Sequence, residues 1–172
     1  MRKAFIALGV VIAALLIAFI TFNQQPKYAD VSMPKADYTH LQESRTNIKR
    51  LIDDLSKFNY KKDSTMAAIE KDAKIIANEN SKDLSSSDAQ TLRDALYGQN
   101  GIVTIVKAAQ TGKYNIDASV ASRFHTGFDS IYTMSVNAIN KSSAQRANIV
   151  TQMKKDLNIE EAIYQIGAKN EE

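Results

Sequence analysis

The chain has 172 residues, of which 24% are charged, and a formal net charge of +3 at neutral pH. It contains no cysteine, which excludes disulfides, thiol chemistry and zinc–thiolate sites. Three of the 22 basic residues precede Asp30, whereas all 19 acidic residues lie from Asp30 onward, so the rest of the chain is formally neutral. Because nucleic-acid-binding proteins usually carry a clustered basic excess, we expect no nucleic-acid partner.

Residues 4–22 form an uninterrupted apolar run of 19 residues without a charge. At 1.5 Å per helical residue the run is about 28 Å long, close to the roughly 30 Å hydrocarbon core of a bilayer. The run therefore predicts a transmembrane signal anchor. A cleaved signal peptide is the alternative, but such peptides usually have a shorter apolar core followed by small residues at the cleavage site.

The short segment 1–3 carries two positive charges, Arg2 and Lys3, directly before the apolar run. The positive-inside bias then places the amino terminus in the cytoplasm and the domain after the span outside the cell membrane. We therefore expect a single-pass membrane protein with an extracytoplasmic carboxyl-terminal domain. If the apolar run is cleaved, that domain is secreted.

Residues 23–36 are polar and contain both prolines of the chain, Pro26 and Pro34, which indicates a stalk or linker. The stretch 37–169 is predicted to be a helical bundle domain, and 170–172 a polar tail. Six glycines and two prolines supply few tight turns, which disfavours an all-β fold.

Apolar residues recur at three- and four-residue spacing along most of this domain. The spacing predicts a helix from Asp37 to about Asn59, a second after Asp63 or Ser64, and a third after a break at 82–87. Residues 102–106 read as a β-type run, but their continuation favours a helix over 102–110, and a single strand would lack a partner. Residues 112–116 form the clearest loop.

A fifth periodic stretch extends from Asp117 to about Leu157 and predicts one helix of about 40 residues. Gly127 and the Ser142–Ser143 pair are the places where it could kink or split. Asn158 and Glu161 resemble a capping box for a last short helix. The predicted fold class is all-α, with one amino-terminal transmembrane helix and an extracytoplasmic antiparallel bundle of about four helices.

An unbroken helix over 117–157 would be roughly 60 Å long, about twice the length of the preceding helices. The segment from about Ser143 therefore either folds back as a hairpin or carries a contact with a partner protein. The candidate partner contact consists of the apolar residues Ile149, Met153, Leu157, Ile163 and Ile166.

The sequence suggests no catalytic residue, cofactor or metal site. His40 and His125 are the only histidines, and neither has the spacing of metal ligands around it. Ser135, Ser142 and Gln145 interrupt the apolar face of the predicted long helix. They indicate either a polar cavity between helices, as in a ligand-sensing bundle, or a helix that emerges into solvent or against a partner.

A membrane span followed by an outer helical bundle resembles the general layout of the LemA family. The R-R-x-D-L-I-P-N-L segment expected early in such a protein is absent, so the resemblance transfers no residue roles. The first hypothesis is a non-enzymatic interaction or structural component of the bacterial cell envelope, which binds another envelope protein or itself. The alternative is an extracytoplasmic ligand-binding or sensor bundle that signals through a partner.

Overall fold

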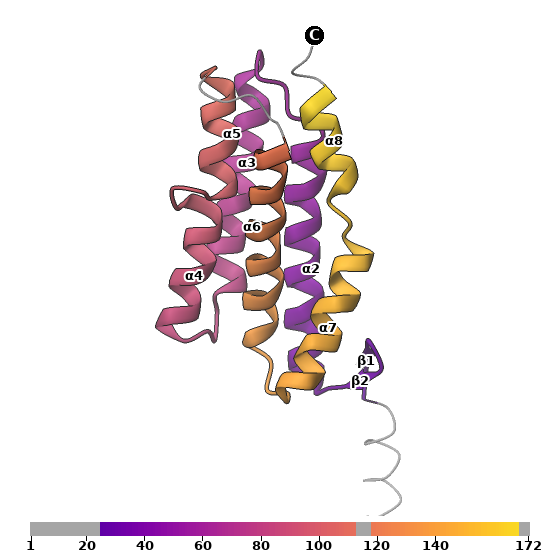
Figure 1. Ribbon diagram of the computed structural model, residues 1–172. Coiled ribbons are helices and arrows are strands. Elements are labelled where there is room, and N and C mark those ends of the chain that lie inside the picture. Colours follow the sequence, from indigo (N-terminus) through magenta and orange to yellow (C-terminus); the bar gives the residue numbers. More distant parts are fainter. Residues whose placement is uncertain (1–24, 113–117, 169–172) are drawn as a thin grey trace, which may run out of the picture.

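The computed structural model describes residues 25–112 and 118–168, and most of these residues are helical (Figure 1). The α-helices are α2 (Lys35–Ser56), α3 (Asp63–Ile75), α4 (Ser86–Tyr97), α5 (Ile102–Gln110), α6 (Ala118–Asn137), α7 (Ser143–Asp156) and α8 (Glu160–Ala168). A π-helical turn, η1 (Ile76–Asn80), continues α3. The expectation of an all-α protein is confirmed at this level.

No helix within the described ranges is both long and apolar enough to cross a bilayer. The predicted span at 4–22, its flank at Arg2 and Lys3, and the predicted tail at 170–172 all lie outside the described residues.

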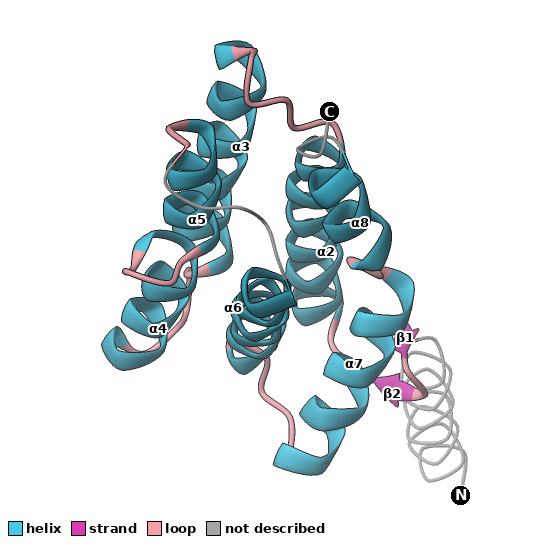
Figure 2. Cartoon of the chain, turned by 45° about the horizontal axis from the view of Figure 1, so that its top comes forward, coloured by secondary structure: helices cyan, strands magenta, loops and turns pink. Residues whose placement is uncertain are grey.

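The helices lie side by side in a bundle (Figures 1 and 2). Helix α2 packs against α3 and α8, and α6 packs against α4 and α7. One continuous hydrophobic core fills the space between them. Its largest fully buried side chains include Phe58, Phe124, Phe128, Met33 and Leu41.

The predicted breaks between the first helices are confirmed. The residues between Gly98 and Gly101 separate α4 from α5. Gly101 lets α5 start close against the end of α4, because a Cβ atom there would lie 2.6 Å from the carbonyl carbon of Leu96. Ser85 caps α4, since its side chain accepts a 3.1 Å hydrogen bond from the Asp88 N–H.

The chain does not form one long helix over 117–157 but splits into α6 and α7, with a break at residues 138–142. The break ends at the Ser142–Ser143 pair, one of the two places where a kink or split was expected. Ser142 and Gln145 form a capping box at the start of α7, in which the Gln145 N–H donates to Ser142 Oγ and the Ser142 N–H donates to Gln145 Oε1. These two polar residues are thus helix caps, and Gly127 lies inside the continuous helix α6.

Because of this break, the carboxyl-terminal segment folds back onto the bundle. Ile149 and Met153 have no exposed surface and Leu157 is 7% exposed, so these candidate partner-contact residues belong to the core. Ile163 is partly buried against the same core. The side chain of Ile166 lies outside the described residues. Of the two alternatives drawn from the sequence, the structure has the hairpin, and an exposed patch at Ile149, Met153 and Leu157 is ruled out.

The segment predicted as a stalk is partly structured from residue 25. Strands β1 (Lys27–Tyr28) and β2 (Val31–Ser32) form a short antiparallel ribbon. The Met33 N–H donates to the Pro26 carbonyl at 3.0 Å, and the Met33 side chain is completely buried. The ribbon is therefore part of the bundle, and α2 begins at Lys35, two residues before the predicted Asp37.

The substitution Ile131→Asp should unfold the bundle. Ile131 is fully buried in the core, and an unpaired carboxylate there would cost several kcal/mol, against a total stability of roughly 5–15 kcal/mol for a domain. Thermal unfolding followed by circular dichroism measures the loss. The matched control is Thr133→Asp on the exposed face of the same helix, which should melt close to the wild type. Equal melting of both variants would contradict the assignment of Ile131 to the core.

Candidate functional site

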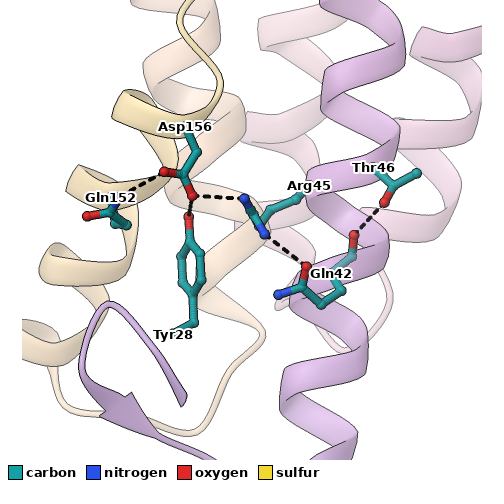
Figure 3. Close-up of polar contacts among 6 residues, drawn as sticks. All are labelled: Tyr28, Gln42, Arg45, Thr46, Gln152 and Asp156. Carbon is teal, nitrogen blue, oxygen red and sulfur yellow. Dashed lines mark hydrogen bonds and ion pairs between the residues drawn. The ribbon is translucent and has the colours of Figure 1, made fainter. Parts of the chain in front are cut away.

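A cluster of polar side chains fastens the amino-terminal ribbon to the bundle (Figure 3). The Tyr28 hydroxyl of β1 donates to Asp156 Oδ2 at 2.7 Å, and Arg45 Nη2 of α2 donates to the same oxygen at 2.8 Å. The Arg45 guanidinium also lies over the Tyr28 ring, 4.6 Å from its centroid, which adds a cation–π contact. We call Tyr28, Arg45 and Asp156 the amino-terminal clamp.

The residues around the clamp favour the ionised form of the Asp156 carboxyl. Gln152 donates to Asp156 Oδ1 at 2.7 Å, and Arg45 Nη1 donates to Gln42 Oε1 at 2.8 Å. Burial opposes ionisation of Asp156, but the hydrogen bonds from Tyr28, Gln152 and Arg45 outweigh it and lower the pKa of its carboxyl. Burial and the hydrogen bond to Asp156 raise the pKa of Tyr28 well above its usual value, so the phenol remains a donor.

The substitution Asp156→Asn should loosen the clamp and lower the free energy of unfolding at pH 7 by about 1 kcal/mol. The side chains of Arg45 and Asp156 are 22% and 27% exposed, so their pair is partly shielded from solvent. Because the folded-state pKa of Asp156 is lowered, its contribution is complete above the unfolded value near pH 4 and is lost as the pH falls through the folded value.

Urea unfolding at pH 7 and at acid pH checks this expectation. The control is Asp129→Asn, which removes the ion pair of Asp129 with Lys154, whose side chains are 57% and 42% exposed. That surface pair should contribute less. Equal losses for the two variants at pH 7 would mean that the clamp is an ordinary surface ion pair.

A buried hydrogen-bond network joins three elements in the interior. Asn80 of η1 accepts from Asn47 Nδ2 of α2 at 3.0 Å and donates to Ser135 Oγ of α6 at 3.0 Å. Ser135 has no exposed surface and Asn80 has 1%, so both polar groups are satisfied within the protein. Ser135 was one of the residues that suggested a polar cavity, and it takes part in a packed network instead.

Asp72 of α3 is another buried polar side chain, but its Oδ2 atom has no hydrogen-bond partner in the part of the chain that the structure describes. The residue is only 5% exposed. Burial, and secondarily the nearby Asp54 carboxylate, raise the pKa of Asp72, whereas Arg50 and Lys71 oppose the shift. Ionised Asp72 therefore costs folding free energy.

The substitution Asp72→Asn should stabilise the protein at pH 7 by about 1 kcal/mol, since it removes a buried charge at constant shape. The folded state holds the Asp72 proton more tightly than the unfolded state. Stability should therefore fall as the pH rises from the unfolded value near 4 through the raised folded value, and the variant should lose this slope. Urea unfolding between pH 4 and pH 7 measures both the free energy of unfolding and its slope with pH. Asp53→Asn, at an exposed ion pair with Lys49, should reproduce neither effect. A destabilised Asp72→Asn protein at pH 7 would contradict this account.

A surface groove of about 620 Å³ lies beside α3, the end of α4, and α5. Its walls include Tyr97, Val103 and Ala108, with Lys74, Glu70 and Lys107 at the polar side. Tyr97 is 42% exposed and is one of two large apolar side chains exposed among the described residues, the other being Tyr164. Partial burial and the Glu70 carboxylate raise the pKa of Tyr97, so the ring offers a neutral hydroxyl. The groove therefore has the apolar surface and aromatic side chain typical of a protein contact.

The two histidines are not brought together. His125 Nε2 lies 3.5 Å from Glu160 Oε1, and His40 Nε2 is buried without a hydrogen-bond partner in the described segments. Within those segments no group of three or more His, Asp or Glu side chains is placed to hold a metal ion.

No family model matches the chain, and comparisons with curated proteins and with solved structures gave no match either. The resemblance in layout to the LemA family thus gains no support from them, and the functional argument depends on the residues themselves.

Proposed function

We propose that this protein is a membrane-anchored, extracytoplasmic helical bundle with a non-enzymatic interaction or structural role in the bacterial cell envelope. Residues 4–22 are the anchor, and Arg2 and Lys3 hold the amino terminus in the cytoplasm. The bundle then presents its surface to another envelope protein or to a second copy of the chain.

The groove beside Tyr97 is the observation that carries the interaction role. It combines apolar walls with an exposed aromatic ring, and its Lys107–Glu70 pair, at 3.4 Å, leaves polar groups at the edge. Buried aromatic side chains with a polar rim dominate the energetics of many protein interfaces. The earlier candidate contact around Ile149 is part of the core, so the Tyr97 groove takes its place.

The alternative, a ligand-binding or sensor bundle, is favoured by a different groove. A surface groove of about 410 Å³ between α4 and α6 is lined by the hydroxyl-bearing residues Thr91, Ser122, Thr126 and Ser130, together with Asp94 and Arg123. Such a lining fits a small zwitterionic ligand, because it offers one acidic and one basic side chain. Loss of ligand-induced thermal stabilisation in Arg123→Ala would support this second candidate.

The membrane topology is tested with a carboxyl-terminal tag on the full chain in bacterial cells. We expect the tag to sediment with membranes and to be digested when protease is added to cells whose outer layers are permeabilised. A protected tag would overturn the orientation. A mature chain that starts after residue 22 and is released to the medium would overturn the anchor.

The interaction surface is tested by placing a photo-crosslinking amino acid at Tyr97 and, as the matched control, at Tyr164, which is also exposed. We expect a discrete covalent adduct from position 97 and none from position 164, since Tyr164 does not line the groove. Tyr97→Ala should reduce binding of the same partner by about tenfold or more, the loss typical of an aromatic hot spot. Equal crosslinking from both positions would contradict a specific contact in the groove.

A further inference from the structure

The ribbon fixes the point at which the chain enters the bundle. Pro26 is held by the hydrogen bond from Met33, and Tyr28 is held by the amino-terminal clamp. Only Asn23, Gln24 and Gln25 separate the apolar run from Pro26. At no more than about 3.6 Å per residue, Pro26 lies within about 14 Å of the end of that run. The headgroup layer is about 5–8 Å thick on each side of a bilayer. With residues 4–22 as the proposed anchor, Pro26, which precedes the ribbon, would lie in or just above this layer.

The ribbon lies at one end of the bundle, where α2 begins and where α6 turns into α7 (Figure 1). We call this end the base. Three lysines lie there: Lys27 on β1, Lys35 at the start of α2, and Lys141 in the turn. Lys27 and Lys35 are exposed, and none of the three takes part in an ion pair within the described ranges. The acidic residues closest to Lys27 and Lys35 along the chain are Asp30 on the ribbon turn and Asp37 in the first turn of α2.

We infer that the base of the bundle docks onto the phospholipid headgroups of the membrane that holds the anchor, with Lys27, Lys35 and Lys141 contacting lipid phosphates. This inference rests on the proposed anchor. The clamp makes the docking specific, because it prevents the ribbon from acting as a free tether and so fixes the bundle upright. The opposite end, where α2 turns into α3, is then held away from the surface by the length of the 22-residue helix α2, about 33 Å.

The absence of cysteine from the chain permits a clean test. A fluorophore is attached to a single cysteine at the base, Asn140→Cys, or at the opposite end, Ser64→Cys; both positions are exposed. The full chain is placed in nanodiscs of phosphatidylcholine and phosphatidylglycerol that contain a lipid with a nitroxide on its headgroup. We expect loss of fluorescence at position 140 and little change at position 64.

Variants of the base lysines and of the clamp, with one control, separate the contributions of these two features to the docking. Reversal of the base charges (Lys27→Glu, Lys35→Glu, Lys141→Glu) or release of the clamp (Tyr28→Phe with Asp156→Asn) should reduce the quenching at position 140. A matched reversal at the opposite end, where α2 turns into α3 (Lys57→Glu, Lys61→Glu, Lys62→Glu), should leave it unchanged. If the base reversal has no effect, the lysine–phosphate contact is overturned.

The outcomes also separate this inference from the proposed anchor. If the chain copurifies with the discs but positions 140 and 64 are quenched equally, the bundle lies on its side or moves freely, and the docking is overturned while the anchor stands. If the chain does not copurify with the discs at all, the anchor and the docking are both overturned.

Discussion

The carboxylate of Asp156 joins parts of the chain that are far apart in sequence. It accepts hydrogen bonds from Tyr28 and Arg45, which precede it by 128 and 111 residues. The contact depends on the reversal of the chain at residues 138–142, because only that reversal brings the end of α7 back beside α2 and the ribbon. The same reversal buries Ile149 and Met153. Closure of the bundle, burial of its last helices and attachment of the ribbon are thus consequences of one change in chain direction.

The interior combines a large apolar core with polar groups that restrict how the helices can pack. Asn80 can bond to Asn47 and Ser135 only when α2, η1 and α6 keep one relative position, since each hydrogen bond needs its partner within about 3 Å. Asn80 is the last residue of the π-helical turn η1, and such turns are rare and often lie at functional sites. Asp72 shows the opposite case, a buried charge that costs stability.

Periodicity predicted the elements whose residues pack locally: α2, α3, α4 and α5 were all expected close to their observed positions. Periodicity failed where a polar residue was compatible with two different local structures. Ser142 and Gln145 were interpreted as polar interruptions of one helix face, whereas the structure has them as the capping box at the start of α7. The ribbon turn was not predictable either, because Ala29 and Asp30 adopt positive φ angles of 52° and 60° without a glycine.

For the clamp, the one sequence signal was Arg45, which falls among the apolar positions of α2; a cation there needs a partner. Its partners Tyr28 and Asp156 could not be chosen, since no local pattern links residues so distant in sequence.

The positions of the base and of the Tyr97 groove relate the two proposals to each other. The base lies at the ribbon end of the bundle, whereas α5, which forms much of the groove, lies toward the opposite end (Figure 1). In the proposed upright orientation the groove would therefore lie toward the end of the bundle that is farther from the lipid, where the proposed protein partner could reach it. A bundle lying on its side would lose this separation, because one flank would then be covered by headgroups. Fixing the orientation through Tyr28 and Asp156 is thus the physical condition under which the proposed anchor, only a few residues from the domain, still leaves the proposed binding surface accessible.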